Sequence, residues 1–130
     1  MSYYLNTTVN GKSFEEAIAS VTEELKKEGF GVLSTIDMSG AFKNKLNVDF
    51  KKYTILGACN PHYAYKVLQT EDKLGVFLPC NVVVEENDNG SVDISIVDPV
   101  SSMTKVDNKH VEGFAAEVQE KLQLVINNLN

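Results

Sequence analysis

Two Cys-Asn dipeptides, each beside a proline, are the part of this sequence whose residue types could do chemistry. Cys59-Asn60-Pro61 follows one apolar run, and Pro79-Cys80-Asn81 lies within another. A thiolate is a nucleophile and a ligand for soft metals. Cys59 comes directly before a predicted helix N-terminus, whose partial positive charge favours the thiolate over the thiol. We therefore predict that Cys59 is the more reactive of the two thiols.

A third segment, Asp98-Pro99, ends another strand-like run. If these runs belong to one sheet, their ends can converge at one edge, where binding sites are often built. We expect a ligand-binding site formed by Cys59, Asn60, Cys80, Asn81 and Asp98, with the Cα atoms of the two cysteines within ~10 Å of each other and no disulfide between them. The side chain of Asn60 is expected to cap the helix that begins at Pro61.

Other interpretations of the cysteines stay open. A free cysteine often packs as a small buried apolar residue. Cys59, His62 and Cys80 could contribute to a zinc site, but the fourth ligand is lacking and His110 lies far along the chain, so we expect no metal. An enzyme with Cys59 as nucleophile would act on a substrate that the sequence does not name, and the sequence identifies no cofactor.

Length and composition narrow the class of protein. The 130 residues fit a single domain, residues 1–130, and 43% of them are hydrophobic. There are 18 acidic and 12 basic residues, all of the latter lysine, so the net charge is −6. This charge argues against nucleic acid or an anionic membrane as partner. The absence of a leader-like or membrane-spanning apolar run, together with only two cysteines, predicts a cytoplasmic protein.

The charge is unevenly distributed along the chain. Residues 71–104 hold seven acids and one lysine, whereas residues 43–66 hold five lysines and one aspartate. The simplest interpretation is two solvated faces. The alternative is that the two stretches attract each other between copies, which would give a symmetric dimer.

The hydrophobic periodicity predicts the elements that position these residues. Strands are expected at 3–9, 30–38, 53–58, 74–86 with an interruption at Pro79, and 91–97, with a hairpin turn at 87–90; helices are expected at 13–28, 41–50, 61–70 and 107–129. Ser13 and Glu16 form a capping box at the first helix. This order indicates an α+β fold with a single curved, largely antiparallel sheet and helices packed on one face.

Three stretches resemble a known family. The sequences ILGACNP at 55–61, LGVFLPCNVVV at 74–84 and VDP at 97–99 are similar to those of the domain of unknown function family 302, small proteins of bacteria and archaea, over nearly the whole chain. The resemblance implies a β-α-β4-α topology like that of the TATA-binding protein, with an extra short helix, and a homodimer. Its signature positions would be Cys59, Asn60, Pro61, Pro79, Cys80, Asn81, Asp98 and Pro99.

The resemblance implies no activity, and a shared topology does not imply DNA binding. Our leading hypothesis is a small cytoplasmic homodimer that binds a small ligand, or handles a thiol or sulfur species, at Cys59 and Cys80. One alternative is a structural or protein-interaction module without a ligand. The other is a cysteine-dependent enzyme.

Overall fold

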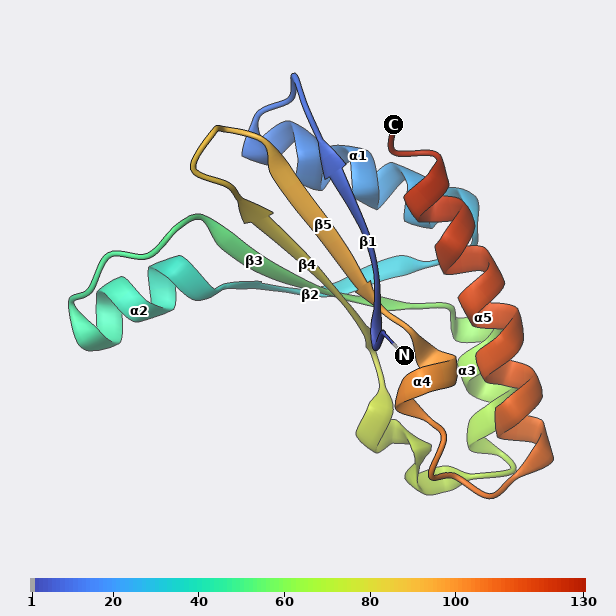
Figure 1. Cartoon of the computed structure of the whole chain (residues 1–130). Coiled ribbons are helices and arrows are strands. Elements are labelled where there is room, and N and C mark those ends of the chain that lie inside the picture. Colours follow the sequence, from blue (N-terminus) through green and yellow to red (C-terminus); the bar gives the residue numbers. More distant parts are fainter. Residues whose placement is uncertain (1) are drawn as a thin grey trace.

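The fold is built on one five-stranded antiparallel sheet with helices packed on it (Figure 1). The computed structural model describes residues 2–130. Its elements, in chain order, are β1 (Tyr4–Val9), α1 (Phe14–Lys27), β2 (Gly31–Asp37), α2 (Met38–Leu46), β3 (Tyr53–Cys59), α3 (Pro61–Leu68), the 3-10 helix η1 (Asp72–Phe77), β4 (Cys80–Glu86), β5 (Val92–Val97), α4 (Pro99–Ser102) and α5 (Lys109–Asn127).

The strands lie in the order β1-β5-β4-β3-β2, and every neighbouring pair is antiparallel. Side chains along β5 alternate between the two faces of the sheet. Val92, Ile94 and Ile96 are buried, and the residues between them are partly exposed. Alternation of this kind places one face of a sheet in the core and leaves the other towards solvent. The predicted α+β class and the antiparallel sheet are therefore confirmed.

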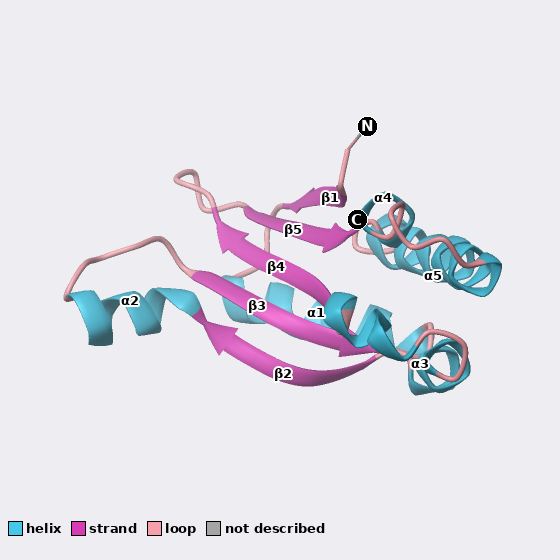
Figure 2. Cartoon of the chain, turned by 90° about the horizontal axis from the view of Figure 1, so that it is seen from below, coloured by secondary structure: helices cyan, strands magenta, loops and turns pink. Residues whose placement is uncertain are grey.

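Helices α1 and α5 cover the buried face (Figure 2). Helix α1 contributes Phe14, Ala17, Val21 and Leu25, the last three of which are fully buried. Burying one such Val or Leu side chain contributes about 1.5–3 kcal/mol to the free energy of unfolding. The predicted capping box is present: Ser13 Oγ accepts the Glu16 N–H at 3.1 Å, and a Glu16 carboxylate oxygen accepts the Ser13 N–H at 2.9 Å.

The prediction of a strand from residue 74 to residue 79 is wrong. These residues form the end of η1 and the turn into β4, which begins only at Cys80. Leu74 is the only buried residue of η1, while Val76 is 82% exposed. A short apolar run does not distinguish strand from helix, and Pro79 has no N–H to donate to a neighbouring strand.

The second helix also differs from the predicted 41–50. Helix α2 starts at Met38, because the Asp37 carboxylate caps it by accepting the Gly40 N–H at 3.0 Å, and it ends at Leu46, before Asn47 with φ 53°. No residue of α2 is buried. In Figures 1 and 2, α2 extends beyond the strands at the end of the sheet opposite α3. We call residues 38–52 the arm. The short helix α4 was not predicted.

Gly57 determines how closely β2 and the Pro79 turn approach β3. A Cβ added at Gly57 would clash with Ser34 Oγ and would lie 2.8 Å from the Pro79 ring. Gly57→Ala should therefore lower the free energy of unfolding by about 1–3 kcal/mol, as overpacking does. Gly31→Ala is the matched control, because a Cβ there meets no atom within 4 Å. Urea unfolding measures both, and equal stability of the two variants would contradict this prediction.

Candidate functional site

The three signature segments meet at one end of the sheet. Strand β3 ends at Cys59, and Cys80 at the start of β4 is paired with Ala58. Strand β5 ends at the same end of the sheet, because Ile96 is paired with Val82 near the start of β4. Asp98 follows Ile96 by two residues. The predicted convergence is confirmed, and the two cysteines lie on adjacent strands as free thiols.

Cys59 and Cys80 line one small cavity. Its other lining residues are Phe30, Ala58, Asn60, Ala64, Leu78, Phe114 and Val118. The cavity measures about 10 Å³, which is close to the smallest space that holds one water molecule. An organic ligand therefore does not fit between the cysteines unless side chains move.

Burial makes both thiols less acidic. It raises the pKa of Cys80 to about 11, with a smaller contribution from the nearby Cys59, and it also raises the pKa of Cys59 above its ordinary value. The lowered pKa that we expected at Cys59 is therefore not found, although Cys59 is the more exposed of the two thiols. The cause at Cys59 is desolvation, because burial disfavours the charged thiolate.

Asn60 does not cap α3 with its side chain, contrary to the prediction. Its amide Nδ2 instead donates to the carbonyl oxygen of Glu28 at 3.3 Å. This bond joins the end of β3 to the turn after α1, where Gly29 has φ 88° and faces the Asn60 amide. Because Asn60 is buried, its donor needs this internal partner. The residue therefore connects two segments that are about thirty positions apart.

Asp98 and Asn81, the remaining candidate site residues, have different structural roles. Asp98 caps α4 by accepting the Val100 N–H at 3.0 Å, and both of its carboxylate oxygens accept from Gln119 Nε2 on α5 at 3.0 Å. Asn81 is exposed and faces away from the core. The five predicted residues therefore share one end of the sheet, but not one binding surface.

The histidines do not join the cysteines. His62 and His110 are both exposed, the first on α3 and the second on α5. Among residues 2–130, no three His, Cys, Asp or Glu side chains gather as a metal site would require.

A larger hollow lies on the open face of the sheet and was not predicted. Its volume is about 480 Å³, and it is lined by Tyr3, Tyr4, Asn6, Tyr53, Asn81, Val83, Glu85, Asp93, Ser95, Ile96 and Val97. Tyrosine combines apolar area with a hydrogen-bonding hydroxyl. The alternation of side chains along the strands was the available signal, because it divides every strand into an inner and an outer face.

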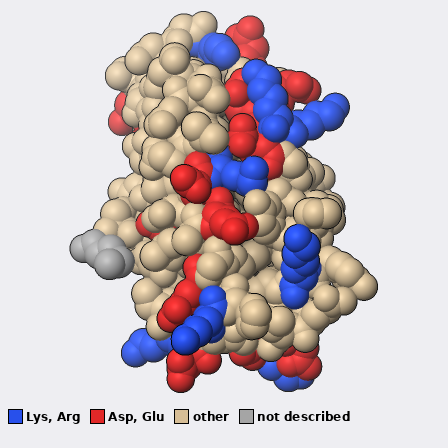
Figure 3. All heavy atoms as spheres, turned by 90° about the vertical axis from the view of Figure 1, so that its right-hand side faces the viewer, with Lys and Arg blue, Asp and Glu red and all other residues tan. Residues whose placement is uncertain are grey.

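Charge differs between the arm and the open face. The arm has four lysines and one aspartate, a net charge of 4 − 1 = +3. The hollow on the open face is lined by two acids, Glu85 and Asp93, and no lysine. Lys51 of the arm already contacts Glu85 at 2.6 Å. On the side of the molecule that carries α5, by contrast, acidic and basic side chains are interspersed (Figure 3).

Replacing Asn60 tests whether it acts as a donor or a cap. Asn60→Ala should lower the free energy of unfolding by about 1–3 kcal/mol, because the Glu28 carbonyl loses its partner. Asn60→Asp should be at least as harmful, since a carboxylate has no N–H to donate and would face that carbonyl oxygen. Asn81→Ala, at an exposed asparagine, is the control. If Asn60→Asp kept the wild-type stability, the side chain would be acting as a cap.

The buried thiol of Cys80 makes stability depend on alkaline pH. Its pKa is higher in the folded chain, about 11, than the ordinary 9.0, so the unfolded chain ionises first as the pH rises. The stabilisation is complete below pH 9 and is lost between pH 9 and 11, by about 2–3 kcal/mol. Subtracting the pH profile of Cys80→Ala from that of the wild type isolates this loss. Parallel profiles would show that Cys80 is not buried as described.

Comparison with known proteins places this fold in a family. The family model "Domain of unknown function DUF302" matches residues 5–129. An uncharacterized protein of Aquifex aeolicus (strain VF5) is 24% identical over 110 residues, which cover 85% of this chain and 69% of that protein. The crystal structure of the uncharacterized conserved protein DUF302 from Bacillus stearothermophilus is similar, with a TM-score of 0.91, 27% identity and complete coverage of both chains.

Among residues 2–130, no helix is long and apolar enough to cross a membrane.

The structural match extends over both the sheet and the helices that cover it. With the family model spanning nearly all of the sequence, the chain belongs to the DUF302 family.

Proposed function

We propose that this protein is a protein-interaction module that forms a homodimer through the open face of its sheet and its arm. The observation that carries the proposal is that both surfaces expose apolar side chains in an ordered fold. Leu46 is 65% exposed and Phe50 is 48% exposed on the arm, while Leu33 and Ile36 are exposed on β2. Clustered exposed apolar residues mark interaction surfaces.

The arm has little stabilisation from its own chain. Helix α2 buries no residue and has nine residues, whereas isolated helices shorter than about 12–15 residues are marginal in water. Phe42, Phe50 and Tyr53 pack on one another, with ring centroids 5.3 and 5.9 Å apart. This small cluster orders the base of the arm, and contact with a second chain would cover the rest.

The second chain is proposed to be another copy because the two surfaces are complementary. The arm carries a net positive charge, and one of its lysines, Lys51, already pairs with Glu85 of the open face within the same chain. Asp93 adds a second carboxylate to the hollow that tyrosines line. In a two-fold dimer each copy can place its arm on the other's open face, so that both contacts form at once. The two-fold symmetry therefore gives the dimer two identical contacts between an arm and an open face.

A ligand or sulfur site at Cys59 and Cys80 has less support. The cavity between them is about 10 Å³, and burial raises the pKa of both thiols. A nucleophilic cysteine needs the opposite, a lowered pKa and access. We therefore assign the two cysteines to packing, and we rank a cysteine-dependent enzyme below the interaction module.

Sedimentation at micromolar concentration tests the homodimer. The wild type should sediment as a dimer whose dissociation increases with salt, because salt screens the attraction between arm and face. Val83→Lys, on the open face, should sediment as a monomer, since it places a positive charge where the positive arm binds. Leu46→Lys, on the arm, should also weaken the dimer.

The matched control is Val76→Lys, at a position on η1 that is 82% exposed, lies outside the arm and does not line the hollow. It should leave the dimer intact, and circular dichroism should show that all three variants are folded. A wild-type monomer at low salt would overturn the proposal. So would a dimer that Val83→Lys does not affect.

A further inference from the structure

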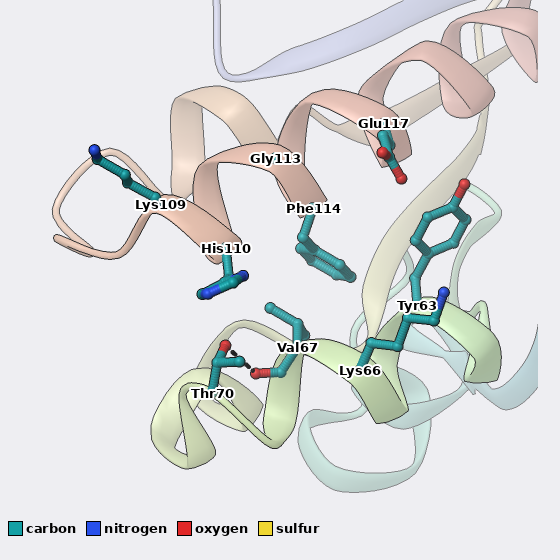
Figure 4. Close-up of a pocket in the computed structure, with 9 residues that line it drawn as sticks. All are labelled: Tyr63, Lys66, Val67, Thr70, Lys109, His110, Gly113, Phe114 and Glu117. Atoms are coloured by element: carbon teal, nitrogen blue, oxygen red, sulfur yellow. Dashed lines mark hydrogen bonds between the residues drawn. The ribbon is translucent and has the colours of Figure 1, made fainter.

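A second candidate surface lies between α3 and α5, away from the arm and the open face. The two helices border an open cleft of about 340 Å³ lined by Tyr63, Lys66, Val67, Thr70, Lys109, His110, Gly113, Phe114 and Glu117. In Figure 4, His110 and Phe114 point from α5 towards Val67 of α3 and Thr70, which follows the end of α3. The volume is within the range of small-molecule sites.

The presence of a glycine, Gly113, in the wall of this cleft distinguishes it from an ordinary surface groove. It lies in the second turn of α5, where glycine is less favourable than alanine. A Cβ built at Gly113 meets no atom within 4 Å, and its φ is not in the left-handed region. No neighbouring group in the described chain therefore requires a glycine at this position. The effect of the missing side chain is to widen the cleft.

The lining indicates the chemistry of a ligand. The floor is apolar, since Val67 and Phe114 are buried, and the Tyr63 ring packs edge-on to Phe114 with centroids 6.5 Å apart. Lys66 and His110 flank Val67 on either side (Figure 4). Lys109 points outward at the rim, and Glu117 lies beside the Tyr63 hydroxyl. Basic groups therefore outnumber acidic ones here, although the whole chain has a net charge of −6.

Lys66 is available to a ligand. Among residues 2–130, neither Lys66 nor Lys109 forms an ion pair with a carboxylate. The His110 backbone N–H is already bound by the Asn108 side chain at 2.9 Å, so the His110 imidazole is the part of that residue that faces the cleft. An ammonium and an imidazole N–H are both donors to carboxylate oxygens.

We propose that this cleft binds a small carboxylic acid with an apolar body. The body lies on Val67 and Phe114 in the space that Gly113 leaves, and the carboxylate accepts hydrogen bonds from Lys66 and His110. This site is independent of the dimer, because it uses neither the arm nor the open face.

Three probes of the same shape and different charge test the proposal by proton–nitrogen NMR of the full chain. Phenylbutyrate should shift the amide signals of Val67, His110, Gly113 and Phe114, with a Kd on the order of 1 mM. Phenylbutanol should bind several-fold more weakly, and phenylbutylamine should bind most weakly. Lys66→Gln should weaken phenylbutyrate roughly fivefold and leave phenylbutanol unchanged, whereas Lys26→Gln on α1 should change neither.

Gly113→Ala separates binding from folding. It should raise the unfolding midpoint by about 2–4 °C, because alanine is the better helix former. It should weaken phenylbutyrate binding roughly fivefold or more, because the added methyl group occupies the space in which we place the apolar body. Gly75→Ala, where a Cβ also meets open space, should leave binding unchanged. A lower midpoint for Gly113→Ala, unchanged binding by it, or equal shifts with all three probes would overturn the proposal.

Discussion

Burial of the valine and isoleucine side chains of β4 and β5 beneath α1 and α5 is the interaction on which the rest of this structure depends. Val82, Val84, Val92, Ile94 and Ile96 are fully buried, and each lies opposite a partner that faces the same way. Since side chains alternate along a strand, this burial also determines which residues face away from the core. The open face is thus a direct consequence of the core.

The same constraint explains the signature residues. Cys80 lies on the inner face and is desolvated, whereas its neighbour Asn81 faces out. Asn60 and Asp98 hold the segments that leave the sheet, the first through the carbonyl of Glu28 and the second through Gln119. Their side chains stabilise the fold, whereas the second copy that we propose would contact the exposed surfaces.

Local signals made much of the fold predictable. The capping box at Ser13 and the apolar stripe after it predict α1, and the alternation of β5 predicts its inner face. The segment at 74–79 could not be assigned because its short apolar run fits either element. The partner of Asn60 could not be found either, because Glu28 is distant in sequence. Neither the hollow on the open face nor the cleft beside Gly113 has a local motif, since each is assembled from several elements.

Hydrogen–deuterium exchange at two protein concentrations tests the central claim, that the arm and the open face are covered by a second copy. No residue of helix α2 is fully buried within its own chain, so its amides should exchange quickly in a dilute monomer. At high concentration, exchange should slow in residues 38–52 and stay the same in α1, which the core already protects. Exchange of the arm that is equally fast at both concentrations would contradict the account.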